Sequence, residues 1–447
     1  MKSTRNIILA AALILLTAPC RGQESDTWKA GWARVDITPD EPVWQGGYAA
    51  RQKPSEGVFQ HIWAKALALE DVSGHKSVLV TMDLLGLPRD FSEDLRGQVL
   101  KKYGIRKQDI ILSASHTHSA PVVGNSLQYI YPMDRNHWKA VYRYTDRLKG
   151  LLLDVIGESL KKAEPVRMYS GNGYARIGFN RRKNNRKFVS STVPVGPSDF
   201  AVPVLKLEGM DNSVKLVIFG HACHPVVNGG YEISGDWAGV AQSEVEKLYP
   251  GAMGMFFQGC GADQNPVCGG MAPNSFMVAY GKQIAAAVEQ VLSEPMKPLR
   301  SKLDTRYAEI DLPFDKPISR EEMQAVADSK SWESRWAKGM MERIDKGEKF
   351  PDTYPYPIEY WDLGGQKLFV LGGEVTSEYS ITLKKEFGED AFVMGYANDV
   401  MSYIPSTTVW REGGYEGFAA NRVYALPARW TGDVETRILD AVDSLVK

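Results

Sequence analysis

The sequence has little cysteine, little histidine and almost no net charge. Its 447 residues include 53 Lys and Arg against 54 Asp and Glu, so the formal charge is −1. A chain with this balance presents no strongly basic surface, and we expect no nucleic-acid partner. Hydrophobic residues at 44% and charged residues at 24% are typical of a folded globular protein, which excludes a disordered chain.

The few cysteines exclude a disulfide framework. Of the four, Cys20 lies in the N-terminal segment, and the other three cannot all pair with one another. One bridge between Cys260 and Cys268 stays open as an alternative to buried free thiols, and Cys223 is expected to pack in the core. The hydrophobic core must therefore supply the stability of the fold.

The one long hydrophobic run is at the N-terminus. Lys2 and Arg5 precede an apolar stretch over residues 7–16, and small or polar residues follow to Gly22, which is typical of a secretory signal peptide. We predict a signal at residues 1–22 and export to the periplasm or the cell exterior. Because this run is too short to cross a bilayer and no other stretch is long enough, we expect no transmembrane span. Cys20 leaves a lipid anchor as an alternative.

Short apolar segments alternate with amphipathic helices along the rest of the chain, which predicts a mixed-sheet α/β layered fold. Strands are predicted at 64–70, 76–82, 108–115, 166–171, 202–208, 214–220, 253–258, 368–371 and 391–394, and helices at 91–102, 142–162, 239–247, 278–292 and 433–446. Residues 301–360 have a different character, because strand-like 307–312 precedes a charged helical region at 320–346. We predict an insertion or subdomain there.

Four of the seven histidines fall into two tight pairs, which is the first indication of function. His116 and His118 follow strand 108–115, and on an extended segment residues i and i+2 project to the same side. His221 and His224 follow a second predicted strand. Imidazole nitrogens are common ligands of catalytic zinc, although hydrogen-bonded histidines at a strand end would give the same pattern.

Several short motifs resemble the neutral/alkaline (non-lysosomal) ceramidase family and occur in that family's order. They are Asp36-Ile37-Thr38-Pro39, Gly47-Tyr48, residues 111–121 (ILSASHTHSAP), Cys223-His224-Pro225, Ser234-Gly235-Asp236, residues 261–266 (GADQNP), Gly373-Glu374-Val375-Thr376 and Gly414-Tyr415-Glu416-Gly417. The resemblance extends from Gly31 to about Gly417. It implies one zinc hydrolase catalytic domain over residues 23–447.

The resemblance also implies a metal site with one Zn²⁺ per chain. By position in the motifs, its ligands are His116, His224, Glu374 and Tyr403. Two neutral imidazoles, a carboxylate and a phenolic oxygen suit zinc and leave room for a water whose pKa falls to about 7. From the residues alone, a helix-capping or ion-paired carboxylate is the favoured interpretation of Glu374, and a half-buried strand tyrosine that of Tyr403.

Around the metal, the resemblance places His118, Arg181 and Tyr415. A second imidazole and a guanidinium would supply donors for a developing oxyanion, and His118 would carry a proton to the leaving group. From the residues alone, Arg181 fits a surface charge as well, since Arg182 and other cations follow it. His221 is expected either to contact a metal ligand without binding the metal itself or to pack in the core.

The chain departs from the family pattern in two places. Family members that cleave ceramide have a serine before the proline of segment 261–266, where this chain has Asn265. An asparagine amide can orient a substrate or stabilise an oxyanion, but it cannot act as a nucleophile. Because the chain ends at residue 447, soon after Tyr415, we also expect no C-terminal β-sandwich domain and fewer lipid contacts.

The sequence therefore predicts an exported, zinc-dependent, ceramidase-like amidase of lipid metabolism, in which metal-bound hydroxide attacks an N-acyl bond. One alternative keeps the metal and acts on an acylated or modified carbohydrate. Another is a non-catalytic binding protein derived from the family. A groove walled by aliphatic and Phe side chains would favour a lipid, whereas exposed Trp and Tyr with Asp or Asn donors would favour a sugar. Oligomeric state has no signature in the sequence.

Overall fold

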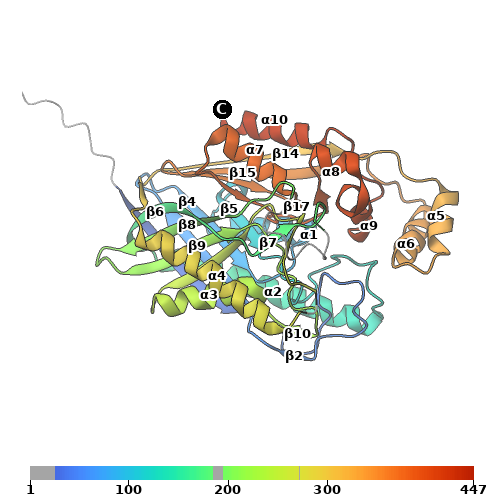
Figure 1. Ribbon diagram of the computed structural model, residues 1–447, viewed down its shortest axis with the longest axis horizontal. Coiled ribbons are helices and arrows are strands. Elements are labelled where there is room, and N and C mark those ends of the chain that lie inside the picture. Colours follow the sequence, from blue (N-terminus) through green and yellow to red (C-terminus); the bar gives the residue numbers. More distant parts are fainter. Residues whose placement is uncertain (1–25, 185–194, 271) are drawn as a thin grey trace, which may run out of the picture.

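The computed structural model describes residues 26–184, 195–270 and 272–447 (Figure 1). The predicted signal peptide and Cys20 lie outside the described residues. Within them, none of the helices combines the length and the apolar character that a membrane crossing requires. Cys223, Cys260 and Cys268 are free, so the bridge left open between Cys260 and Cys268 is not formed.

A large mixed sheet forms the centre of the fold. Its strand order is β11-β9-β8-β6-β1-β3-β4-β5, with β13 beside β6. The strands are β1 (Thr27–Asp36), β3 (Trp63–Glu70), β4 (Lys76–Met82), β5 (Ile110–Ala114), β6 (Glu164–Tyr174), β8 (Ala201–Gly209), β9 (Val214–His221), β11 (Met253–Gln258) and β13 (Lys297–Leu299). The sheet curls until β11 and β5, which stand at opposite ends of this order, contact each other.

A second sheet packs against the first. It has the order β14-β15-β16-β18 and comprises β14 (Leu303–Pro313), β15 (Thr353–Leu363), β16 (Lys367–Leu371) and β18 (Phe392–Met394). Leu67 and Leu69 of β3 share one buried cluster with Trp361 and Leu368 of this sheet. The alternate β3 residues, among them Ala66, face the helices instead, as the twofold repeat of a strand requires.

Helices cover the outer faces of both sheets, which completes a layered α/β fold (Figure 1). On the large sheet, α1 (Arg89–Tyr103) and α2 (Arg135–Lys161) pack on one half, and α3 (Asp236–Leu248) and α4 (Asn274–Ser293) pack on the other. On the small sheet lie α7 (Ser377–Phe387) and α10 (Val434–Val446). The predicted fold class is confirmed.

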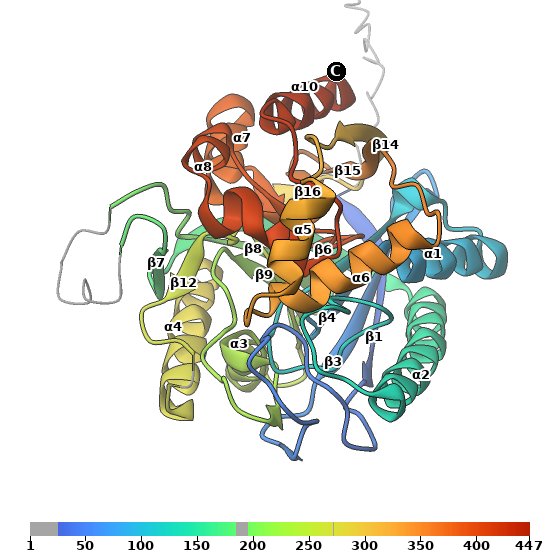
Figure 2. The same cartoon turned by 90° about the vertical axis from the view of Figure 1, so that its right-hand side faces the viewer.

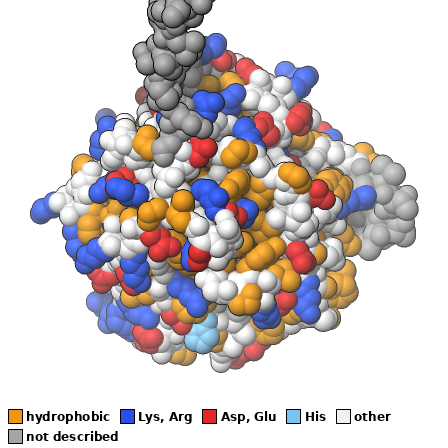
Figure 3. Space-filling view, turned by 90° about the vertical axis from the view of Figure 1, so that its left-hand side faces the viewer, with side chains coloured by type: hydrophobic (Ala, Val, Ile, Leu, Met, Phe, Trp, Pro, Cys, Tyr) orange, Lys and Arg blue, Asp and Glu red, His pale blue; other side chains and the backbone are white. Residues whose placement is uncertain are grey.

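Residues 301–360 contribute two strands to the second sheet and a helical hairpin between them. β14 and β15 pair along their whole length. The hairpin consists of α5 (Arg320–Ala327) and α6 (Glu333–Asp345) around a small core that includes Trp336. It projects from one end of the molecule and lies in front of the other elements in Figure 2. On the opposite face, hydrophobic side chains gather among interspersed acidic and basic ones (Figure 3).

The segment that follows β18 joins the two edges of the curled sheet. The backbone N–H of Gly395 donates to Gln258 O at the end of β11, and the backbone N–H of Asn398 donates to Leu112 O in β5. The Asn398 side chain accepts a further bond from Leu112 N at 2.9 Å. Because this segment lies between the ends of β5 and β11, the loops that follow both strands meet at one place.

Candidate metal centre and active site

Four side chains from distant parts of the chain meet where these strands end. Glu374 Oε2 lies 3.1 Å from His116 Nε2 and 3.2 Å from His224 Nε2. The Tyr403 hydroxyl lies 3.3 Å from His224 Nε2. All four residues are buried. The structure thus brings together the four residues that the motifs associate with a metal.

Short, specific backbone features place these residues. His116 lies just beyond β5 with a φ of 64°, a left-handed conformation that is uncommon for a residue with a side chain. His224 lies just beyond β9. Glu374 and Tyr403 face each other across the two-residue parallel strands β17 (Glu374–Val375) and β19 (Tyr403–Ile404).

The donor set fits a divalent cation. His116 Nδ1 lies 2.7 Å from Leu85 O and His224 Nδ1 lies 2.8 Å from Gly261 O, so each ring turns the lone pair of its Nε2 towards Glu374. Glu374 Oε2 is buried and has no hydrogen-bond partner among the described residues. A buried carboxylate oxygen without a donor is costly unless a cation lies beside it. The oxygen and nitrogen donors present are those that zinc accepts.

The charges of these groups also suit metal binding, which requires neutral imidazole and ionised carboxylate. Burial lowers the pKa of His224 to about 4. Burial alone would raise the pKa of Glu374, but attraction to the positive charge that His116 and His224 carry when protonated holds that pKa well below its usual value. Near neutral pH the site therefore presents a neutral His224 and a carboxylate.

His118 is a third imidazole at the same place. Its Nε2 lies 3.2 Å from His116 Nε2, and with His116 and His224 it forms a buried group that could hold a metal ion. The Nδ1 atoms of His116 and His224 each face a backbone carbonyl, whereas His118 Nδ1 is buried and has no hydrogen-bond partner in the described chain. The ring packs against Tyr48, with 4.9 Å between ring centroids. Burial lowers the pKa of His118 well below its usual value.

Arg181 connects the remaining predicted site residues. Its Nη2 donates to the Tyr403 hydroxyl at 3.2 Å, and its Nη1 donates to Asn265 Oδ1 at 3.2 Å. Its Nε donates to Glu416 Oε1 at 2.7 Å. The Tyr415 ring stands edge-on to the Tyr403 ring at 5.2 Å. Arg181, Asn265 and Tyr415 therefore lie at the same centre.

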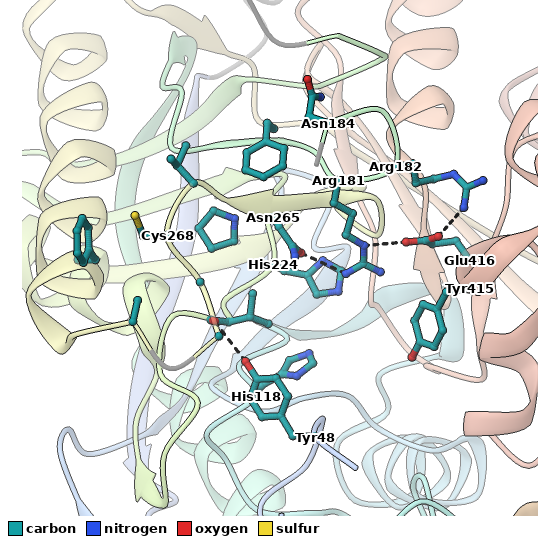
Figure 4. A pocket seen from close by; sticks show the side chains of 18 of the residues that line it. Tyr48, His118, Arg181, Arg182, Asn184, His224, Asn265, Cys268, Tyr415 and Glu416 are labelled. Carbon is teal, nitrogen blue, oxygen red and sulfur yellow. Dashed lines mark hydrogen bonds and ion pairs between the residues drawn. The ribbon is translucent and has the colours of Figure 1, made fainter. Parts of the chain in front are cut away.

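An open pocket of about 950 Å³ leads to this centre, and Figure 4 shows its lining. His118, His224 and Tyr403 line it, whereas His116 and Glu374 do not. Apolar and polar side chains both contribute to its walls. The apolar ones include Phe179, Val226, Pro266, Val267 and Phe276, and the polar ones include Arg181, Arg182, Asn184 and Glu416.

Two site tyrosines were not predicted from the sequence. The Tyr424 hydroxyl donates to Glu374 Oε1 at 2.5 Å, and the Tyr396 ring lies 4.3 Å from the His116 ring. Neither belongs to a motif, and no spacing singles them out. Glu416 belongs to the motif Gly414-Tyr415-Glu416-Gly417, so the sequence did indicate that this residue, which binds Arg181, lies near the site.

His221 does not join the cluster. Its Nδ1 lies 3.1 Å from Ala201 O, and its ring packs edge-on against Trp237. It is 2% exposed. This places His221 in the core, as expected.

Comparison with known proteins identifies the family. Residues 28–276 match the family described as "Neutral/alkaline non-lysosomal ceramidase, N-terminal". A neutral ceramidase of Pseudomonas aeruginosa is 25% identical over 209 residues, which cover 45% of this chain and 30% of that protein. A neutral ceramidase of Drosophila pseudoobscura pseudoobscura is 32% identical over 115 residues, which cover 25% of this chain and 16% of that protein. The matched segments thus span less than a third of these relatives.

A solved structure shows the same fold. The crystal structure of neutral ceramidase from Pseudomonas aeruginosa superposes with a TM-score of 0.71 at 18% identity, covering 94% of this chain and 74% of that chain. The family match extends over more than half of the sequence, from residue 28 to residue 276. The chain therefore belongs to the neutral/alkaline non-lysosomal ceramidase family.

Proposed function

We propose that this protein is an exported, zinc-dependent amidase that hydrolyses the N-acyl bond of a ceramide-like lipid. The observation that carries the proposal is the buried donor cluster, in which Glu374 Oε2 has no donor and faces two imidazole nitrogens. Membership of a ceramidase family supports hydrolysis of an amide bond.

The proposed zinc ligands are His116, His224, Glu374 and Tyr403. When bound, the metal supplies a Lewis acid for the acyl carbonyl and lowers the pKa of a bound water to about 7. Histidines that bind metals usually donate their second ring N–H to a carbonyl or carboxylate, and His116 and His224 have such a carbonyl. His118 has none, so we do not place it among the ligands.

His118 is proposed as the proton carrier. It lines the pocket, and its lowered pKa keeps the imidazole uncharged and makes the protonated ring a ready proton donor. A proton taken up at its Nε2 can then pass to the leaving amine nitrogen. Arg51 fixes the backbone of this residue by donating from Nη1 to the His118 carbonyl at 2.6 Å.

Arg181 and its partners are proposed to stabilise negative charge on the acyl oxygen. Glu416 fixes the guanidinium, which reaches both Tyr403 and Asn265. Fixed donors of this kind are effective because they need no reorganisation during the reaction. Asn265 Oδ1 accepts a hydrogen bond from Arg181, so we assign the Asn265 amide nitrogen to orienting the substrate. Tyr415 is 41% exposed and lines the pocket, so its hydroxyl is a further donor there.

The pocket favours a lipid over a carbohydrate. Val226, Val267 and Phe276 provide an apolar surface for an acyl chain, while Arg182 and Asn184 provide polar contacts for a head group. Tyr48, Tyr415, Asn184 and Asn265 also line the pocket and would suit a sugar, although among the described residues no tryptophan does. Family membership, added to the apolar wall, is the reason for proposing the lipid.

Zinc analysis combined with an amide-hydrolysis assay tests the proposal. We expect one zinc per chain and turnover of a fluorescent ceramide in preference to acylated sugars. His224→Ala should lose both metal and activity, whereas His221→Ala, which changes a buried histidine outside the cluster, should keep its zinc. A wild-type protein without stoichiometric metal would overturn the mechanism, and zinc without turnover of any acyl substrate would favour the non-catalytic alternative.

Export is tested separately by sequencing the N-terminus of the protein recovered from the periplasm or medium. If residues 1–22 are removed as we expect, the mature chain begins at Gln23. An acylated N-terminal Cys20 would show a lipoprotein instead. Retention of Met1 would contradict export through a cleaved signal.

A further inference from the structure

The two oxygens of Glu374 have different partners. Oε2 faces His116 and His224 and has no hydrogen-bond donor, whereas Oε1 accepts a 2.5 Å bond from the Tyr424 hydroxyl. A carboxylate can bind a cation through one oxygen or through both. The tyrosine therefore takes up one of the two lone pairs of the oxygen that a second metal–oxygen bond would need, and it holds that oxygen on the side away from the imidazoles.

Tyr424 is firmly held in this position. It follows α9 (Ala420–Val423), and its ring packs against three buried clusters, one of which contains Tyr403. Asn421 anchors the same segment, because its Oδ1 accepts from Ser402 Oγ at 2.8 Å and its Nδ2 donates to Ala428 O at 2.9 Å. Since Ser402 precedes Tyr403, the segment that carries Tyr424 is tied to the residue next to another proposed ligand.

We propose that Tyr424 is a positioning residue that restricts Glu374 to binding the metal through Oε2 alone. The inference rests on the proposed metal site. A carboxylate held to one oxygen contributes one ligand, which keeps a coordination position open for water and substrate, as catalytic zinc sites require. Partners that orient a metal ligand in this way typically change metal affinity by about 10–100-fold when they are removed.

A purely structural role for the same hydrogen bond predicts a different result. If Tyr424 only satisfied a buried oxygen, its removal would lower stability without changing how the metal is bound. Tyr144 provides the matched control, because its buried hydroxyl donates to Ile37 O at 2.9 Å in the core between α2 and the large sheet. Tyr144→Phe therefore removes a comparable buried hydrogen bond away from the site.

The experiment compares Tyr424→Phe and Tyr144→Phe with the wild type. Three quantities are measured: zinc affinity by chelator competition, the visible absorption spectrum of the Co²⁺-substituted protein, and unfolding in urea. For Tyr424→Phe we expect zinc binding to weaken about 10–100-fold and the Co²⁺ bands to lose intensity, since a second carboxylate oxygen raises the coordination number. Tyr144→Phe should lose stability only.

Three outcomes would overturn the inference, and they can be told apart. If the wild type binds zinc and Tyr424→Phe matches it in both affinity and Co²⁺ spectrum, the inference is wrong and the proposed function stands. If the wild type binds neither Zn²⁺ nor Co²⁺, the proposed function fails and the inference fails with it. Equal changes in Tyr424→Phe and Tyr144→Phe would also count against a positioning role.

Discussion

Replacing Gly47 with alanine should disable His118 without removing the metal. Gly47 has a φ of 98°, and a Cβ built on it would lie 2.2 Å from His118 Nδ1. The imidazole has little room to retreat, because the Tyr48 ring packs on it and His116 Nε2 lies 3.2 Å from its Nε2. The Gly47 backbone is also held, since its N–H donates to the Tyr131 hydroxyl at 2.7 Å.

The size of the effect follows from this geometry. An ordinary carbon contact begins near 3.4 Å, so the His118 ring must move by about 1 Å to admit the new methyl group. A displacement of about 1 Å at a reacting group costs about 10²-fold in rate. The left-handed backbone adds roughly 1–2 kcal/mol of strain for alanine, which lowers stability.

The assay measures kcat, KM, zinc content and the free energy of unfolding in urea. Gly74→Ala is the matched control, because Gly74 has a φ of 84° and nothing within 4 Å of its Cβ position. We expect the strained backbone to cost each variant about 1–2 kcal/mol, and the clash with His118 to cost Gly47→Ala roughly 1–3 kcal/mol more. Only Gly47→Ala should lose about 10²-fold in kcat at full zinc content. If Gly47→Ala keeps the kcat of Gly74→Ala, the assigned role of His118 is wrong.

Three further predictions test the site and the core. Arg181→Lys removes the planar fork that reaches Tyr403 and Asn265, so we expect kcat to fall about 10²-fold at unchanged zinc content. Arg437→Lys, which changes a surface arginine paired with Asp433, is the control, and equal activity of the two variants would contradict this prediction. Removing metal with a chelator should abolish hydrolysis and lower the thermal unfolding midpoint. The midpoint falls because a ligand at a hundredfold excess over its Kd stabilises the folded chain by about 2.7 kcal/mol. An unchanged midpoint would argue against a bound metal. Burial raises the pKa of Asp236 to about 6, so the folded protein keeps a proton that the unfolded chain releases near pH 4. The unfolding free energy in urea should therefore fall by up to about 3 kcal/mol between pH 4 and 6 relative to Asp236→Asn, and parallel pH profiles would refute the assignment.

Much of the fold could be predicted because hydrophobic periodicity determines it. The strands expected at 64–70 and 76–82 are β3 and β4, and they pair as an antiparallel hairpin. The alternation of Ala66 and Leu67 between the two faces follows from burial of both sides of the strand. Where both faces are covered, the pattern is strong and the prediction is accurate.

Errors occur where local chemistry departs from that pattern. The helix expected from residue 142 begins at Arg135, because the side chain of Asp134 caps its N-terminus by accepting from Asn136 N and His137 N. β15 was not predicted, since Pro355 and Pro357 indicate turns. Both prolines pair with β14 but lie beyond the end of β16, so the missing N–H groups leave no ladder bond unmade on that side.

The site was accessible only in part from local sequence. The two histidine pairs stand out by spacing, whereas Glu374 and Tyr403 were identified through the family resemblance. Their contact depends on pairing of two very short strands, β17 and β19, which no local periodicity can reveal. Tyr424 reaches Glu374 from yet another segment, and its position depends on packing among three clusters.

Backbone strain explains why this region resists prediction from propensity. Of seven described non-glycine residues with positive φ, four surround the centre or support its strands: His116, Asp236, Tyr396 and Asn398. The Tyr396 ring packs on His116, and Asn398 fixes β5 through Leu112. Non-glycine residues rarely adopt the left-handed backbone conformation, and they do so mainly where tertiary contacts stabilise it. Such positions concentrate at functional sites. The conformation that turns His116 towards Glu374 therefore comes from the assembled fold. For this reason the family's motifs, rather than local preferences, identify these positions in the sequence.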